Sequence, residues 1–408
     1  MRRARRSPGY RTAVVLGLHR GGLALARALG RSGVPVHGIS WDDDAGTRTR
    51  YVTQLHRTRV AYGGERDLET LAILQRIAND RRLVLLPDND DGVEFVLAHW
   101  DLVREIADVP LPDPQTVQSL RRKELLPETA ARAGIATPRT ASADSEEAIR
   151  NAGLRPPLLV KPVEGKVFVS IYGEKLFLAE TVDDAVAGWR RASARGVETV
   201  VQELIPDAEG DIYSLFTYIA RRGEPLASVV GRKVRQLPVR FGSSTVFESC
   251  REPKPLELGL ALLESVGYRG FAHVEFALDR RDGSFSLIEV NTRIPVWGGI
   301  GARRRFDIAS AAYRDLCGLH VDALGVMTDT VRWIDLRRDI TAFVRTQDRH
   351  LGEFLAPYLT RRKARAYFAI DDPAPAAALG RAAGRRLLTK LGDTARRSPS
   401  PEELRRPV

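Results

Sequence analysis

The segment at residues 271–293 constrains the fold of this chain more than any other part of the sequence. It reads FAHVEFALDRRDGSFSLIEVNTR, which predicts two strands joined by a turn at residues 280–283. Centring the hairpin on this turn places Glu275 opposite Glu289, and the two-residue period of a strand keeps Asn291 on the same face as Glu289. The sequence therefore predicts a sheet that holds two carboxylates and an amide side by side.

This acidic pair indicates a bound divalent cation. Like charges directly opposite each other destabilise a hairpin, and a cation between them removes that cost. Oxygen ligands, with the remaining positions left to water and phosphate, suit Mg²⁺ better than zinc. We therefore predict that Glu275, Glu289 and Asn291 bind Mg²⁺, or Mn²⁺ in its place, and that Arg293 is a catalytic cation beside the metal. The alternative is an amphipathic hairpin whose glutamates face solvent.

Short apolar runs and helical patterns alternate along most of the 408 residues. The run at 12–16 is followed by a glycine-containing turn, a helical pattern and a second run at 34–39, which predicts a strand-helix-strand unit. A third run at 83–87 leads into an acidic turn, and the pattern changes near residues 110–115. These features predict a small parallel α/β domain, followed by a larger part of mixed α/β and α+β character.

The net charge of +11 is concentrated at the two ends of the chain. Five arginines precede the first predicted strand, and a net excess of five positive charges follows Pro373, so the body is nearly neutral. Charged ends of this composition are usually solvated tails, which argues against a nucleic-acid partner. The apolar runs fall short of the roughly 20 residues that span a bilayer, so we predict no membrane partner and a cytoplasmic location. Two cysteines are too few for a disulfide framework.

The hairpin strings VEF and IEVNTR resemble the metal-binding signature of the ATP-grasp superfamily, and further elements occur in that family's order. Lys123, ahead of the string GIATP, resembles the first phosphate-binding lysine of the family, and Lys161 in the string LVKP resembles the second. The resemblance implies an N-terminal pre-ATP-grasp α/β domain followed by a two-lobed ATP-grasp domain. On this basis we expect a basic tail at 1–11, the pre-ATP-grasp domain at 12–112, both ATP-grasp lobes at 113–345, an extension packed on the body at 346–372, and a basic, disordered tail at 373–408.

The string TVVQELIPDAEGD at 199–211 resembles the hinge strand of the family, whose backbone and first polar side chains meet the adenine edge. Glu209 or Asp211 would then bind the ribose hydroxyls. The residues after the second lysine lack the Gly- and Ser-rich lid of many members, so the lid is either short or held by Lys166 or Lys175. We include Lys175 among the nucleotide-binding candidates. The residues expected to border the base are Gln202, Glu203, Leu204 and Ile205.

The string GRKVRQLPVRFGSST at 231–245 resembles a segment of the carboxylate-amine ligase branch, in which a basic strand leads into a small-residue loop at the acyl site. Arg232 and Arg235 are the candidate catalytic cations of this segment. Because side chains alternate along a strand, at most one of them, or Lys233 instead, can reach the transferring phosphate without a bulge.

The resemblance implies an ATP- and Mg²⁺-dependent ligase that activates a carboxylate as an acyl phosphate and transfers it to an amine, with release of ADP and phosphate. Its partners would be a small-molecule carboxylate and an amine, and homodimers are common in the superfamily. The alternative is a non-catalytic ATP-binding regulatory module. The three predicted metal ligands argue against that alternative, because binding ATP alone does not require so many.

Overall fold

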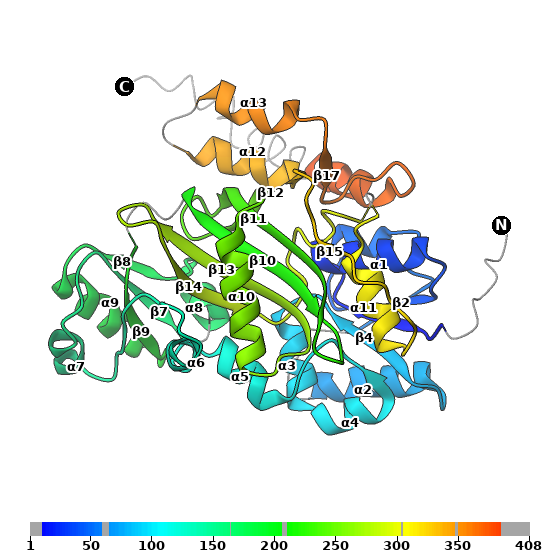
Figure 1. The fold of residues 1–408 in the computed structure, drawn as a ribbon, viewed down its shortest axis with the longest axis horizontal. Helices are drawn as coiled ribbons and strands as arrows, with labels where there is room; N and C mark the ends of the chain where they lie inside the picture. Colours follow the sequence, from blue (N-terminus) through cyan, green and yellow to red (C-terminus); the bar gives the residue numbers. More distant parts are fainter. Residues whose placement is uncertain are drawn as a thin grey trace, which may run out of the picture.

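A computed structural model describes residues 10–58, 65–163, 165–205, 210–302, 305–346 and 350–384 of the chain (Figure 1). The described residues form three sheets, of five, four and eight strands. In Figure 1 the five-stranded sheet lies at one side of the molecule, the four-stranded sheet at the other, and the eight-stranded sheet between them. No helix in these ranges is long and apolar enough to cross a membrane.

The N-terminal sheet has the strand order β3-β2-β1-β4-β5, and its strands pair in parallel. This arrangement confirms the small parallel α/β unit predicted from the alternating apolar runs. Its strands are β1 (Ala13–Leu16), β2 (Val36–Ser40), β3 (Gln54–Arg57), β4 (Leu83–Pro87) and β5 (Ala107–Asp108). Its helices are α1 (Arg20–Arg31), the short 3₁₀ helix η1 (Ala45–Arg48), α2 (Glu65–Ala78), α3 (Asp90–Ala98) and α4 (Trp100–Ile106).

The turn after β1 is built around Asp88, the residue that follows β4. Asp88 Oδ2 accepts hydrogen bonds from the backbone N–H groups of His19 at 2.8 Å and Gly22 at 3.2 Å. Gly17 has a φ of +93°, and a Cβ added to it would lie 2.1 Å from Asp88 Oδ1, so this turn requires glycine. The carboxylate caps α1 and holds the turns after β1 and β4 together at one edge of the sheet.

The four-stranded sheet has the order β6-β9-β7-β8 and its neighbouring strands are antiparallel. Two helices precede this sheet, and Lys123 lies in the turn between them, which spans the residues from Arg121 to Leu126. The elements of this region are α5 (Pro114–Arg121), α6 (Leu126–Arg132), β6 (Thr140–Ser142), α7 (Glu146–Asn151), β7 (Leu158–Pro162), α8 (Gly165–Tyr172), β8 (Phe177–Ala179), α9 (Val182–Ser193) and β9 (Thr199–Glu203).

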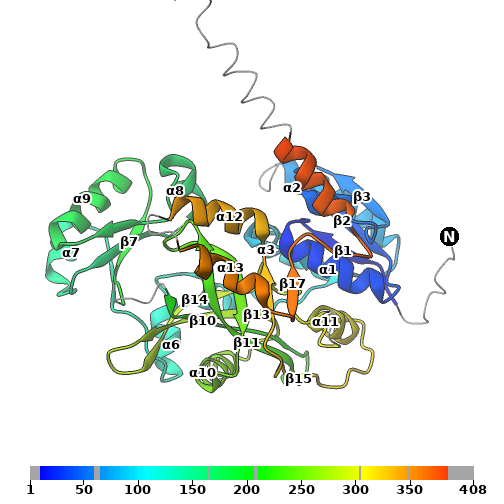
Figure 2. The ribbon, with the colours of Figure 1, turned by 90° about the horizontal axis from the view of Figure 1, so that it is seen from above.

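The eight-stranded sheet carries the hairpin on which the sequence analysis rests. Its main order is β14-β13-β10-β11-β12-β16-β17, and β15 pairs with β11. Helix α10 covers one face, and α11 and α12 cover the other (Figure 2). The strands are β10 (Ile212–Ile219), β11 (Pro225–Leu237), β12 (Ser243–Ser249), β13 (Gly270–Asp279), β14 (Ser284–Asn291), β15 (Gly325–Val326), β16 (Arg332–Ile334) and β17 (Lys363–Arg365). The helices are α10 (Pro253–Ser265), α11 (Ile308–Leu316), α12 (Leu336–Arg345) and α13 (Leu351–Leu359).

Parts of both predicted tails belong to the fold. Arg11 donates a hydrogen bond of 2.6 Å to Asp108 at the end of β5. Residues 374–384 are helical, and their apolar side chains pack against the core. Just before this helix, Asp372 accepts a hydrogen bond of 2.9 Å from Arg27 on α1. The structure differs here from the predicted disordered tail, because a buried ion pair and an apolar face anchor a segment whose composition resembles a linker. The remaining tail residues lie outside the described ranges.

Candidate active site

The hairpin of β13 and β14 brings the predicted metal ligands together. Glu275 pairs with Glu289 across the two strands, and His273 pairs with Asn291, which confirms the predicted register. Glu275 is 8% exposed and Asn291 is 9% exposed, whereas Glu289 is exposed. Strand β13 lies between β10 and β14, so Glu275 projects from an inner strand of the sheet and not from an edge strand. The Glu275 carboxylate and the Asn291 amide are therefore buried, and the Glu289 carboxylate opposite Glu275 is exposed to solvent.

Glu275 is surrounded by polar and basic groups. Lys233 Nζ lies 3.5 Å from Glu275 Oε1, His273 Nε2 lies 3.7 Å from the same oxygen, and Ser214 Oγ lies at 3.4 Å. Burial alone would raise the pKa of Glu275, but the charges of Lys233, His273 and Lys175 outweigh it and lower the pKa to about 2. The carboxylate is therefore ionised at neutral pH, as a metal ligand must be.

Three lysines lie within electrostatic reach of Glu289. Burial lowers the pKa values of Lys123, Lys161 and Lys175, and the charge of Glu289 opposes that effect in each of them. Lys161 Nζ donates a hydrogen bond of 2.5 Å to Gln202, and Lys123 Nζ donates to the carbonyl of Pro162. For Lys161, burial and then the charge of Lys123 lower the pKa to about 8. Closely spaced, desolvated ammonium groups are the charge pattern of a site for polyphosphate.

The predicted adenine segment is held by polar contacts within the smaller lobe and by one apolar contact with the large sheet. Gln202 accepts from Lys161 and donates to Thr140 at 2.8 Å. Glu203 accepts from the backbone N–H of Arg155 at 2.9 Å, and the backbone N–H of Leu204 donates to Pro157. The remaining side chain of the predicted group, that of Ile205, packs with Ile212, Ala277 and Ile288.

Of the two residues predicted to bind the ribose, only Asp211 lies within the described residues. Glu209 lies outside the described residues. Asp211 is 5% exposed and binds the guanidinium of Arg280 through two hydrogen bonds, one of them 2.9 Å long. That ion pair holds the start of β10 against the end of β13.

Arg293 joins the metal strand to the N-terminal domain. Its guanidinium forms a two-point ion pair with Asp90 at the start of α3, with hydrogen bonds of 3.0 and 2.8 Å. A further contact of 3.4 Å runs from Arg293 Nη2 to Asn291 Oδ1. Burial would lower the pKa of Arg293, but Asp90 and then Glu289 raise it above its ordinary value. The acidic turn after β4 thus faces the metal hairpin, as its place at the carboxyl end of a parallel strand suggests.

The basic strand β11 presents Lys233, and not either predicted arginine, to Glu275. Arg232 pairs with Glu248 at 3.2 Å, and Arg235 binds Asp339 of α12 with hydrogen bonds of 2.8 and 2.6 Å. The strand is irregular between Lys233 and Arg235. Lys233 also donates a hydrogen bond of 3.2 Å to the carbonyl of Gly242, in the loop that joins β11 to β12. A regular strand would place Lys233 and Arg235 on one face, so alternation alone did not single out Lys233, and the irregularity between the two residues separates their partners.

The edge of the N-terminal sheet contributes a further cation, which the sequence analysis missed. His19 Nε2 lies 2.9 Å from Asp42 Oδ2, and its Nδ1 lies 3.4 Å from Asp88 Oδ2. Burial alone would lower the pKa of His19, but its hydrogen bonds to the two aspartates raise it to about 10. The sequence did contain a signal for this contact. Strands β1 and β4 are parallel, so the turns that follow them, with His19 and Asp88, meet at the same edge of the sheet.

Comparisons with known proteins agree with this arrangement. The model of the carbamoyl-phosphate synthase L chain, ATP binding domain, matches residues 251–303, which include β13, β14 and Arg293. A D-aspartate ligase of Enterococcus faecium (strain Aus0004) is 24% identical over 264 residues, which are 60% of this chain. The match spans 62% of that relative, less than two thirds of its length.

Two solved structures have similar folds. The L-amino acid ligase of Bacillus licheniformis matches with a TM-score of 0.58 and 15% identity, over 75% of this chain and 74% of that one. The biotin carboxylase domain dimer of the Hydrogenobacter thermophilus 2-oxoglutarate carboxylase, solved with MgADP, ADP and bicarbonate, matches with a TM-score of 0.60 and 15% identity, over 76% and 70%. The chain has the ATP-grasp fold. The resemblance read from the hairpin is therefore confirmed for the fold.

Within the ATP-grasp fold, the segment after the second lysine is helix α8 instead of a Gly- and Ser-rich loop. Phe168 is buried, and its ring lies 4.7 Å from those of Tyr172 and Phe177. These rings hold α8 on the smaller lobe, next to β8. The exposed side of α8 carries Val167 and Ile171, which are 44% and 38% exposed.

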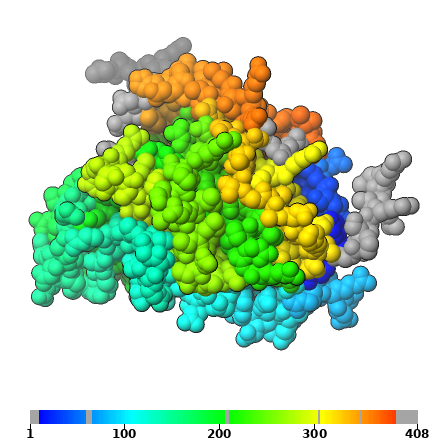
Figure 3. Space-filling model, in the orientation of Figure 1, coloured from blue at the N-terminus to red at the C-terminus, as the bar shows by residue number. Residues whose placement is uncertain are grey.

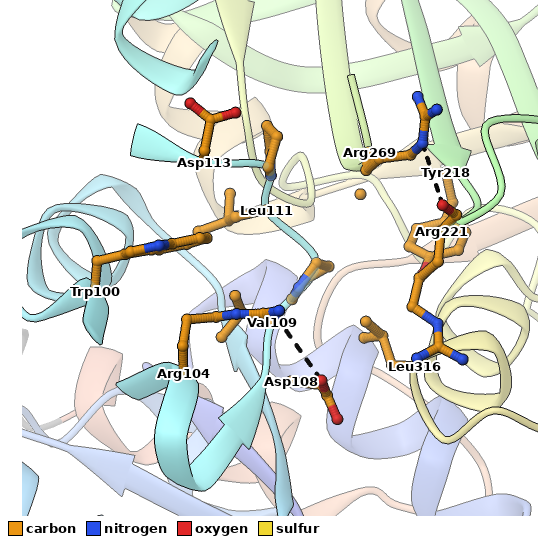
Figure 4. Close-up of a pocket in the computed structure, with 13 residues that line it drawn as sticks. Trp100, Arg104, Asp108, Val109, Leu111, Asp113, Tyr218, Arg221, Arg269 and Leu316 are labelled. Carbon is orange, nitrogen blue, oxygen red and sulfur yellow. Dashed lines mark hydrogen bonds and ion pairs between the residues drawn. The ribbon is translucent and has the colours of Figure 1, made fainter. Parts of the chain in front are cut away.

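A cavity of about 300 Å³ lies away from the candidate site, at the junction of the N-terminal domain and the large sheet (Figure 4). It is lined by Trp100 and Arg104 of α4, by residues 108–113, by Tyr218 of β10, and by Arg269, which directly precedes β13. Most of its polar groups are already paired, since Tyr218 binds Asp315 and Arg269 donates to backbone carbonyls.

Proposed function

We propose that this protein is an ATP- and Mg²⁺-dependent carboxylate-amine ligase, which forms a C–N bond and releases ADP and phosphate. The observation that carries this proposal is the pair of Glu275 and Glu289, with four lysines from four segments of the chain in electrostatic reach. Such a ring of cations around a metal-binding pair suits the charge of a nucleoside triphosphate in phosphoryl transfer. The names of the matched D-aspartate ligase and L-amino acid ligase support the same reaction class.

The metal would be held by Glu275, Glu289 and Asn291. Their oxygen donors fit a hard divalent cation, and the low pKa of Glu275 keeps that ligand ionised. When bound, Mg²⁺ would neutralise charge on the phosphate oxygens. Because Asp90 already holds Arg293, we propose that Arg293 positions the Asn291 amide and joins the two domains at the metal strand.

The phosphates would lie between the lysines of the two lobes. Lys161 approaches from the smaller lobe, Lys123 from the turn between α5 and α6, and Lys233 from the large sheet beside Glu275. We propose Lys233 as the cation at the transferring phosphate, with Arg232 and Arg235 holding its strand in place through Glu248 and Asp339. The adenine would meet residues 202–205, and a ribose contact by Glu209 or Asp211 stays a prediction.

The reaction would proceed in two displacements. A carboxylate oxygen of the first substrate attacks the γ-phosphorus, the bond between that phosphorus and ADP breaks, and an acyl phosphate forms. The amine nitrogen then attacks the acyl carbon, the C–O bond to phosphate breaks, and the nitrogen loses a proton. Helix α8 stands where it could shield the acyl phosphate from water, which would otherwise hydrolyse it.

The substrates we propose are an amino acid and an amine. The printed names of the relative and of the solved neighbour both contain an amino acid, and both are ligases. A non-catalytic ATP-binding module is not favoured, because it would not need a buried carboxylate held at a pKa of about 2 opposite a second one. The cytoplasmic location stays a prediction.

The test is ADP release from ATP and Mg²⁺ by the purified protein, with pooled amino acids in the presence and absence of pooled amines. Glu289→Ala is the inactive reference, and Glu264→Ala, which removes an exposed carboxylate on α10, is the matched control. We expect release that requires an amino acid and disappears only with Glu289→Ala. Tight ATP binding without turnover in any pool would instead indicate the regulatory module.

We also propose that the protein forms a homodimer through α12 and α13, which lie at the upper edge of the molecule in Figure 3. Phe343 of α12 stacks on Phe354 of α13 at 4.4 Å and joins the helices. Each helix carries an apolar stripe with a four-residue repeat, and the exposed basic residues of α12 could face Glu353 of α13 in a second copy. The stripes, 45–82% exposed, are Leu336, Ile340 and Val344, and Leu351, Leu355 and Leu359. Six large apolar side chains would make the core of a standard interface, of roughly 800 Å² per partner.

A further inference from the structure

Two arginines on the substrate side of the hairpin have more hydrogen-bond donors than the described residues satisfy. Arg20 is the first residue of α1, and its Nη1 donates to Asp335 Oδ2 at 3.1 Å. Arg338 lies in the first turn of α12, and its Nη2 donates to the carbonyl of Leu237. The Nε–H groups of both arginines are buried and have no acceptor among the described residues. Buried donors without an acceptor are rare in folded proteins, and they mark a place where a partner is missing.

The position of the two arginines connects them to the proposed active site. A Cβ added to Gly21, the neighbour of Arg20, would lie 3.0 Å from Ile294, the residue that follows Arg293. The carbonyl that Arg338 binds ends β11, the strand of Lys233. The charge of Arg338 also acts on Lys175, which lies within reach of Glu289. Both arginines therefore lie next to elements that carry the proposed active site, Arg20 beside the end of the metal hairpin and Arg338 at the end of the strand of Lys233.

The charge at this place is positive. Asp335 contacts both α1 and α12. Its Oδ2 accepts a hydrogen bond from Arg20 of α1, and its Oδ1 caps α12 by accepting from the backbone N–H of Arg338. Asp44, a second acid in reach of Arg20, is occupied in capping η1 through the backbone N–H of Gly46. Arg20 and the start of α12 meet at Asp335, and burial and then the charge of Arg20 lower the pKa of Arg338, so the two guanidinium charges repel each other. An anion between them would remove this repulsion.

We propose that Arg20 and Arg338 form a subsite for a second carboxylate of the substrate, so that this ligase acts on an amino acid with an acidic side chain. This inference rests on the proposed function. The reacting carboxylate would face the metal and Lys233, and the other carboxylate would accept hydrogen bonds from the two guanidinium groups. The acidic amino acid in the name of the matched D-aspartate ligase is of this class.

A structural role for the same arginines makes a different prediction. If they only tie α1 and α12 to the body, then replacing either one lowers stability and leaves the choice between acidic and neutral amino acids unchanged. If they form the subsite, replacing either one removes the preference for the acid and leaves nucleotide binding unchanged.

The test measures binding by calorimetry with Mg²⁺ and a non-hydrolysable ATP analogue present. The probes are D- and L-aspartate, each compared with the alanine of the same configuration. We expect one aspartate to bind the unmodified protein at least tenfold more tightly than its alanine counterpart. Arg338→Gln and Arg20→Gln should remove this difference, and Arg338→Lys should keep part of it. Arg337→Gln is the matched control, because it removes the same charge from an exposed neighbour on α12.

Equal binding of aspartate and alanine by the unmodified protein, or an aspartate preference that survives both glutamine variants, would overturn the subsite. If Arg338→Gln does not fold, Arg20→Gln on the other helix decides the question, with thermal unfolding as the check. A different result would contradict the proposed ligase activity and leave the subsite standing. In that case aspartate binds in an arginine-dependent manner, but no ADP forms with any amine.

Discussion

The charge pair between Lys233 and Glu275 leads to a stability prediction that tests the electrostatics of the site. The pKa of Glu275 falls from 4.5 to about 2 on folding. A shift of this size corresponds to about 3 kcal/mol of folding free energy at pH 7, at roughly 1.4 kcal/mol for each pKa unit. Both side chains are 8% exposed, so little solvent screening reduces the value. Glu275→Gln should therefore lower the free energy of unfolding by about 3 kcal/mol, because it leaves the ammonium of Lys233 buried without its anion.

The low pKa of Glu275 also predicts how the stability difference between the unmodified protein and Glu275→Gln changes with pH. A folded-state pKa below the unfolded-state value stabilises the protein above the unfolded pKa, and the contribution is lost as the pH falls through the folded pKa. The difference between the unmodified protein and Glu275→Gln should shrink from about 3 kcal/mol at pH 7 to about 2 kcal/mol at pH 3.5. Urea unfolding at these two pH values measures it, with Glu264→Gln as the exposed control. A difference below about 0.5 kcal/mol at pH 7, or one that grows as the pH falls, would refute the reasoning.

Three further predictions follow from the site and from the surface. The affinity for ATP should be constant up to about pH 7 and should fall as the pH rises above about 8, because Lys161 loses its proton there; affinity independent of pH up to 9.5 would contradict this role. In the ADP-release assay, Lys233→Met should lower kcat at least a hundredfold and Arg232→Met less than tenfold, and equal losses would argue against Lys233 at the phosphate. Light scattering should give twice the mass of one chain for the unmodified protein and the mass of one chain for Ile340→Glu combined with Leu355→Glu, and a single-chain mass for both would exclude the helix-pair dimer.

The pairing of the metal hairpin was predictable because its determinants are local. A turn at 280–283 and the two-residue period of a strand are enough to place Glu275 opposite Glu289 and Asn291 opposite His273. The same is true of the parallel N-terminal sheet, since each apolar run is bounded by a turn and a helical pattern. Such features need no contact between distant parts of the chain.

The choice of the cation beside Glu275 could not be read from the strand alone. Arg232, Lys233 and Arg235 are equally basic in the sequence, and the structure separates them through acids on other elements. Glu248 lies on the neighbouring strand β12, and Asp339 lies on α12, so each arginine finds a partner that no local pattern indicates. Strand alternation showed only that Arg232 and Arg235 cannot both reach the transferring phosphate without a bulge.

The C-terminal segment shows that local sequence patterns also failed to predict which part of the predicted tail is folded. Residues 374–384 have the composition of a solvated tail, yet they form a helix because Asp372 is bound by Arg27 of α1 and the helix packs on the core. Composition predicts disorder when a segment has no partner, and the partner here comes from the opposite end of the chain.

The sequence by itself placed the acidic pair on the hairpin through strand periodicity, and the resemblance of its motifs to the ATP-grasp superfamily indicated the fold and two lysines that lie near the pair. Only the tertiary structure decided that Asp90 holds Arg293, that Lys233 meets Glu275, and that the buried Nε–H groups of Arg20 and Arg338 find no acceptor among the described residues. The first contact joins two domains, and the second joins two strands that are not neighbours in the large sheet. Their distances depend on how whole sheets and helices pack, which short-range patterns in a chain do not encode.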